Sequence, residues 1–105
     1  MIKVKVGKEN SIYKKIELLG HAMYDDYGKD IVCASFSTMI ITTINAILTF
    51  DQSAISYTDT NDLKIINVKK DNITNRLLNN LVNMIYELRD NYDKNIKVKE
   101  ENQDV

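Results

Sequence analysis

A run of twenty residues without a charged side chain, Ile31 to Phe50, constrains the fold of this 105-residue chain more than any other feature. The run contains neither Gly nor Pro, and it is long enough to cross a bilayer as a helix. Its β-branched residues from Ile40 to Ile44 favour a strand, whereas its largest apolar residues recur at helical spacing: Phe36, Ile40, Ile44, Ile47 and Leu48. Twenty residues exceed an ordinary strand, so the length predicts a helix.

Polar side chains indicate whether this helix lies in a bilayer or in a protein core. Seven of them are spread through the run: Ser35, Ser37, Thr38, Thr42, Thr43, Asn45 and Thr49. Such a polar content is unfavourable for a membrane span and is typical of a soluble helix that is buried over most of its circumference. Asp30 directly precedes the run and can serve as its N-cap.

The first thirty residues predict a hairpin followed by a loop. Residues 2–7 alternate apolar side chains with lysines, a turn follows from Gly7 to Ser11, and residues 12–20 form a second strand. His21 then stands at a strand end. Residues 22–30 have no apolar period and read as a loop that tolerates movement.

The second half of the chain predicts another hairpin and another helix. Two short apolar runs, Ala54 to Thr58 and Leu63 to Val68, flank a turn-forming segment. Asp71 or Asn72 can cap a helix whose apolar stripe continues to about Tyr92. The polar residues 97–105 predict a short extended stretch and then a frayed tail.

These elements predict an α+β fold in the order strand-strand-helix-strand-strand-helix, with one sheet packed against two helices. The length fits one compact domain, which we expect to span residues 1–96, with residues 97–105 as a polar C-terminal tail.

The composition indicates which cellular compartment and which kinds of partner to expect. The formal net charge is −1, so no strong electrostatic partner is implied, and we expect neither membrane association nor direct nucleic acid binding. A single cysteine cannot form an internal disulfide, and the first residues, MIKVKV, lack the features of a signal peptide. The expected location is the cytoplasm.

Cys33 and His21, the single cysteine and the single histidine, carry the candidate chemistry. A thiol with a pKa of about 8.5 is mostly protonated at neutral pH, so a nucleophilic cysteine needs its thiolate stabilised. The predicted helix places Cys33 in a first turn, where backbone N–H groups favour an anion, and an imidazolium at His21 would add a positive charge. The alternative is a buried structural cysteine and a solvated histidine.

Two further residues are candidates for supporting roles. Asp30 either orients His21 as a third catalytic residue or only caps the helix. Ser37 lies one turn after Cys33 and either hydrogen-bonds near the thiol or bonds to its own helix backbone.

The segments Gly20-His21-Ala22 and GKDIVCASFS, residues 28–37, closely resemble the two signature segments of the ribosomal-processing cysteine protease family Prp. The likeness continues through Thr43-Ile44-Asn45-Ala46-Ile47 and the final helix. By this resemblance, the catalytic histidine falls on His21 and the catalytic cysteine on Cys33.

The resemblance implies a function. Members of the family remove a short N-terminal extension from ribosomal large-subunit protein 27, act as homodimers and use no cofactor or metal. The implied reaction is thiolate attack, an acyl-enzyme intermediate and hydrolysis. The loop at 22–30 matches the family's mobile loop, where Tyr24 and Tyr27 either wall the peptide groove or cover the core.

The alternative function is a non-catalytic, ribosome-associated protein-binding module in which Cys33 is structural. Redox or metal sensing lacks a second cysteine and a sufficient ligand set.

Overall fold

The computed structural model describes residues 2–19, 27–60 and 62–102. Seven elements follow one another along the chain, namely β1 (Ile2–Glu9), β2 (Ile12–Leu19), α1 (Tyr27–Phe50), β3 (Ile55–Asp59), β4 (Leu63–Asn67), α2 (Asn72–Asn91) and β5 (Ile96–Asn102). The predicted α+β class and its first six elements are confirmed. The seventh element, β5, was not expected as a full strand.

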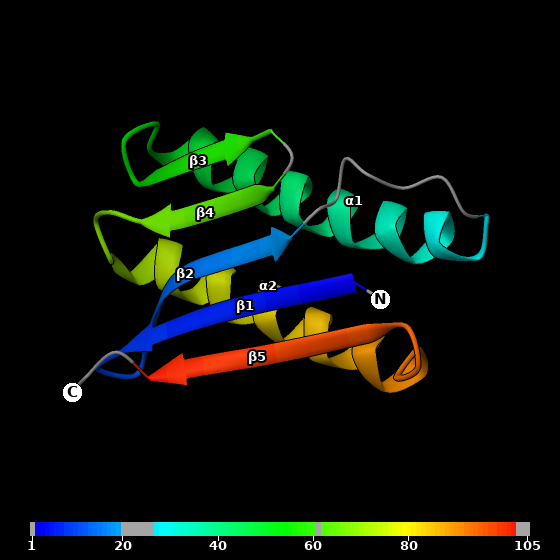
Figure 1. Ribbon diagram of the computed structural model, residues 1–105. Helices are drawn as coiled ribbons and strands as arrows, with labels where there is room; N and C mark the ends of the chain where they lie inside the picture. The colour runs from blue at the N-terminus through cyan, green and yellow to red at the C-terminus, as the bar shows by residue number, and fades with distance from the viewer. Residues whose placement is uncertain (1, 20–26, 61, 103–105) are drawn as a thin grey trace.

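The five strands form one mixed sheet in the order β3-β4-β2-β1-β5. Neighbouring strands are antiparallel except β1 and β5, which run parallel. Both helices lie behind the sheet in Figure 1, so they cover one face and leave the other without a helix. The fold is therefore two layers, and its core lies between the sheet and the helices.

The first hairpin is closed by Asn10 and Ser11, whose φ angles are 52° and 65°. Two successive positive φ angles are those of a two-residue turn that matches the strand twist, and Asn adopts this conformation readily. The register shifts after Gly7, which marks a β-bulge. Gly7 thus belongs to β1, and the turn is tighter than the sequence predicted.

Helix α1 begins at Tyr27, four residues before the uncharged run. The prediction that Asp30 caps this helix is therefore wrong, because Asp30 is its fourth residue and an N-cap precedes the first. The polar side chains of α1 are partly satisfied within the helix. The hydroxyl groups of Ser35 and Thr43 donate to the carbonyl oxygens four residues earlier, at 2.9 Å and 2.8 Å.

The apolar stripe of α1 packs into the core. Residues 31–50 have the length and hydropathy of a membrane span, but the inward side of this segment is buried against the rest of the domain. The buried members recur at helical spacing: Val32, Cys33, Phe36, Ile40, Ile44 and Ile47. This stripe supports the expectation of a core helix.

Helix α2 begins as the sequence predicts. The Asp71 side chain accepts a hydrogen bond from the Thr74 backbone N–H at 2.8 Å, which makes Asp71 the N-cap. The buried Asn67 of β4 fixes the approach to this helix, since its amide donates to Tyr13 O and to Asn75 Oδ1 at 3.1 Å and 2.9 Å. A buried amide with its donors satisfied joins β2, β4 and α2.

Strand β5 corrects the expectation of a polar tail after residue 96. It pairs in register with β1 from Ile96 to Asn102, so at least six residues of the expected tail belong to the sheet. The polar sequence did not predict a strand here, because an edge strand with one open face needs few apolar residues. In β5 only Ile96 is fully buried.

Tyr86 of α2 fastens β5 to the helix layer. Its hydroxyl donates to the Glu100 carboxylate at 2.6 Å, and the Arg89 guanidinium lies 4.8 Å from its ring. Burial, followed by the hydrogen bond and the negative charge of Glu100, raises the pKa of Tyr86 to about 12. The phenol therefore stays protonated and able to donate at all ordinary pH values.

We expect Tyr86→Phe to destabilise the protein by about 1 kcal/mol, because it removes the donor to Glu100. Because the folded-state pKa exceeds the usual value of 10, this difference is fully present below pH 10 and fades as pH rises toward about 12. Urea unfolding of both proteins measures it. Tyr57→Phe, at a half-exposed tyrosine of β3, is the control, and equal losses for the two variants would show that the bond does not anchor β5.

Candidate active site

Cys33 lies on the inward side of α1, where 7% of it is exposed. It belongs to the same buried cluster as Phe36 of α1 and Leu18 of β2. The Cys33 Sγ lies 3.9 Å from the Ser37 Oγ, and either group can be the donor. The predicted proximity of Ser37 to the thiol is thus present, as a long contact of the kind that sulfur makes.

The extra N-terminal turn of α1 changes the electrostatic argument for Cys33. The sequence placed Cys33 in a first turn, but it stands six residues after Tyr27 and so lies in the second. Only the first four N–H groups of a helix lack a partner within it, and the effect of the dipole falls off within the first turn. Free backbone N–H groups of α1 therefore do not flank the thiol as expected.

The other candidate residues are less fully described. Tyr27 and Asp30 lie in the first turn of α1, before Cys33. His21 and Tyr24 lie outside the described residues, as does most of the segment expected to be a mobile loop. The pairing of His21 with Cys33, and the orientation of His21 by Asp30, therefore stay predictions.

Within residues 2–19, 27–60 and 62–102, no three His, Cys, Asp or Glu side chains are grouped so that they could hold a metal ion. The reactive atom in the described part of the site is thus the sulfur of Cys33. A thiol next to a hydroxyl, held on a long helix against a sheet, suits nucleophilic chemistry once a base and an approach for the substrate are supplied.

Solved structures share this fold over nearly the whole chain. SMU.848 from Streptococcus mutans superimposes with a TM-score of 0.84 at 26% identity, covering 98% of this chain and 96% of that one. The S. aureus ribosomal processing protease Prp in complex with a substrate peptide gives a TM-score of 0.87 at 22% identity, covering 96% and 100%. The same protease with a covalently linked product peptide gives 0.82 at 24%, with equal coverage. No curated protein sequence matches the chain.

The sequence places this small α+β domain and its single thiol among the cysteine proteases, because a family model of that class matches residues 1–97. The model describes cysteine protease Prp, and the chain belongs to that family. The resemblance seen in the two signature segments is thereby confirmed.

Ser37 should raise the reactivity of Cys33 by donating to the thiolate. We expect Ser37→Ala to slow alkylation of Cys33 by iodoacetamide near neutral pH by about fivefold, as befits the loss of about 1 kcal/mol of hydrogen bonding. The rate is followed against pH by mass spectrometry. Ser35→Ala is the matched control, since the Ser35 hydroxyl bonds to Ile31 O instead. Equal rates in both variants would assign Ser37 to the helix backbone only.

Proposed function

We propose that this protein is a cysteine endopeptidase in which Cys33 is the nucleophile and His21 the general base. The observation that carries the proposal is the match to the Prp family over residues 1–97, which includes both residues.

The proposed reaction proceeds in two steps. His21 takes the thiol proton, the Cys33 sulfur attacks the peptide carbonyl carbon, and His21 returns the proton to the leaving amine, which gives a thioester acyl-enzyme. Water activated by His21 then hydrolyses the thioester and restores the thiol. Since Cys33 lies beyond the first turn of α1, the imidazolium of His21 carries most of the thiolate stabilisation in this scheme.

The proposed substrate is the precursor of ribosomal large-subunit protein 27, from which the enzyme removes the N-terminal extension. One relative, the S. aureus protease, was solved both with a substrate peptide and with a covalently linked product peptide, and these two structures support a peptide substrate. Tyr24 and Tyr27 are the proposed walls of the peptide groove, and Asp30 the proposed partner of His21. Asp30 is not the N-cap of α1, so of the two roles considered from the sequence only the orientation of His21 remains.

The second candidate is a non-catalytic, ribosome-associated binding module. One observation favours it: Cys33 is buried among core residues, as a structural cysteine is. This function predicts an inert thiol. A nucleophile with the same burial needs an opening through which its substrate can reach the sulfur.

The outward side of α1 supports the proposal of a homodimer. Between Ile31 and Phe50, the part of α1 whose side-chain exposure is described, the exposed residues recur at helical spacing and none of them is charged: Ile31, Ala34, Thr38, Ile41, Thr42, Asn45, Thr49 and Phe50. Ile31 and Phe50 are each 67% exposed, and a groove of about 330 Å³ lies between α1 and α2 along part of this surface. An uncharged surface on a chain with 28% charged residues suits a protein interface. We place the protein in the cytoplasm, where a single thiol stays reduced.

The proposed chemistry is tested by incubating the protein with a peptide that spans the extension and analysing the products by mass spectrometry. We expect one cut by the native protein, no cut by Cys33→Ala and a rate lowered by about 10²–10⁴ in His21→Gln, which loses the base. Ser35→Ala should cut normally. Absence of cutting together with an inert Cys33 would favour the binding module.

The proposed dimer is tested by light scattering after size exclusion. Thr42→Lys combined with Asn45→Lys places two charges in the uncharged surface of α1 and should shift the protein from dimer to monomer. The control combines Ser56→Lys with Thr58→Lys, at exposed positions of β3, and should stay dimeric. A monomeric native protein, or dissociation of both variants, would contradict the proposed interface.

A further inference from the structure

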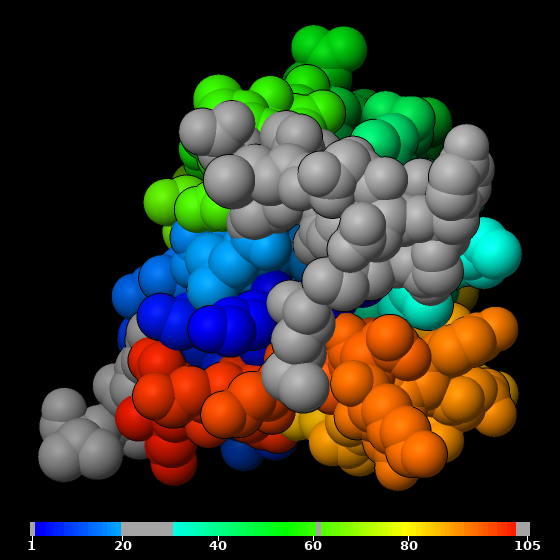
Figure 2. Space-filling model, turned by 45° about the vertical axis from the view of Figure 1, so that its right-hand side comes forward, coloured from blue at the N-terminus to red at the C-terminus, as the bar shows by residue number. Residues whose placement is uncertain are grey.

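The face of the sheet that carries no helix is strongly basic. Register places four lysines on adjoining strands there, Lys3 and Lys5 on β1 and Lys97 and Lys99 on β5, and we call these four the lysine cluster. Figure 2 shows β1 in blue and β5 in red and orange side by side at the surface. All four residues are exposed.

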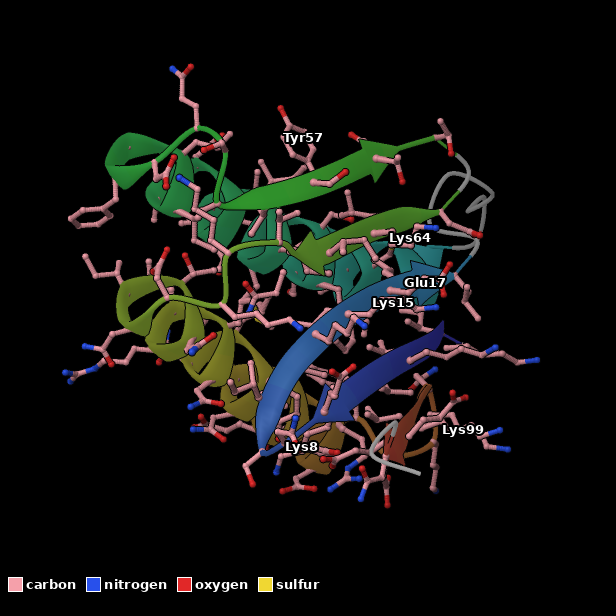
Figure 3. All side chains as sticks on the ribbon, turned by 90° about the vertical axis from the view of Figure 1, so that its left-hand side faces the viewer. Lys8, Lys15, Glu17, Tyr57, Lys64 and Lys99 are labelled. Carbon is pink, nitrogen blue, oxygen red and sulfur yellow. The ribbon has the colours of Figure 1, made fainter. Side chains whose placement is uncertain are left out.

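Two more lysines continue the basic face across the sheet. Lys15 lies two residues before Glu17 on β2, and Lys64 lies opposite Glu17 on the neighbouring strand β4, as Figure 3 shows. Besides Glu17, the strand alternation puts two acidic residues on this face: Glu101 of β5 and Glu9 at the end of β1, which is paired with Lys14 at 2.9 Å. Six lysines therefore meet three glutamates, although the whole chain has a formal net charge of −1.

The pairing within the lysine cluster brings like charges together. Lys3 stands opposite Lys97, and Lys5 opposite Lys99, on strands about 4.8 Å apart. Like charges directly opposite one another in a sheet are unfavourable. Within the part of the chain that the structure describes, Lys99 has an acidic partner, Glu101 at 3.8 Å, and no ion pair involves the other three. An external anion would relieve this repulsion.

The lysine cluster surrounds a hollow of about 140 Å³, which is also lined by Val4 and Leu19. Water takes up about 30 Å³ per molecule, so the hollow has room for one phosphate group with a few waters. Successive lysines on one strand are about 6.6 Å apart, since alternate residues share a face. The cluster therefore offers several cations to a chain of phosphates.

We propose that this face binds the phosphate backbone of double-stranded RNA without reading its sequence. Lysine is a point-charge binder of phosphate, and the two arginines of the chain, Arg76 and Arg89, both lie on α2 instead. Among the described residues that the register assigns to this face none is aromatic, which disfavours base stacking and insertion into a membrane interface. An exposed sheet face fits the wide, shallow minor groove of A-form RNA better than the narrow minor groove of B-form DNA.

This inference stands apart from the proposed peptidase, because the lysine cluster lies on the open face and Cys33 on the face packed against the helices. It also departs from the expectation of no nucleic acid binding. That expectation rested on net charge, which averages over faces of opposite sign.

Fluorescence anisotropy with a labelled RNA duplex of about 16 base pairs, at about 50 mM and about 200 mM salt, tests the proposal. The native protein should bind with a log–log salt slope of roughly −3.6, as four neutralised phosphates require. Lys3→Gln combined with Lys97→Gln should weaken binding at least tenfold at low salt and reduce the slope by about 2. Lys3→Arg combined with Lys97→Arg keeps the charge and should bind normally.

The matched control is Arg76→Gln combined with Arg89→Gln, which removes the same charge on α2, the helix that packs against the opposite face of the sheet, and should bind as the native protein does. Circular dichroism melts confirm that each variant is folded. No binding at low salt, or equal weakening in the control, would overturn the proposal. Tighter binding of a duplex DNA or of a polyglutamate peptide would assign the face to that anion and equally reject RNA.

Discussion

The packing of the apolar stripe of α1 against the sheet is the interaction on which the rest of the structure depends. Phe36, Ile40 and Ile47 are almost completely buried there, and burying such side chains contributes about 1.5–3 kcal/mol each. The strand alternation puts few apolar residues on the other face of the sheet, so the helices cover only this one side. Helix α2 completes the layer, and its link from Tyr86 to Glu100 brings the last strand into the sheet.

The same packing determines what Cys33 can do. The thiol is one member of the buried stripe, so its position is rigid and its approach is restricted. Because α1 starts one turn earlier than the uncharged run, the backbone at Cys33 is already committed to helix hydrogen bonds. Activation of the thiol must then come from side chains, which is why the proposed mechanism gives the imidazolium of His21 the main electrostatic role and Ser37 a minor one.

A two-layer architecture also separates the charges of the chain. Alternation along a strand sends every second residue to the open face, and on β1 and β5 those residues are lysines. The parallel register then aligns the two rows, so a chain of almost neutral net charge acquires a basic surface. The proposed catalytic site and the proposed RNA-binding face share β1 and β2 but use opposite sides of them, which lets one small domain carry both.

The sequence by itself determined most of the elements and the candidate residues, because periodicity and capping are local. Spacing predicted the first hairpin, the core helix, a helix cap at Asp71 or Asn72, and the position of Ser37 one turn after Cys33. Tertiary structure alone decided three further features. It extended α1 back to Tyr27, it turned the polar residues after Ile96 into an edge strand, and it aligned two rows of lysines. Each depends on pairing or packing between distant segments, and no local pattern encodes which strands become neighbours.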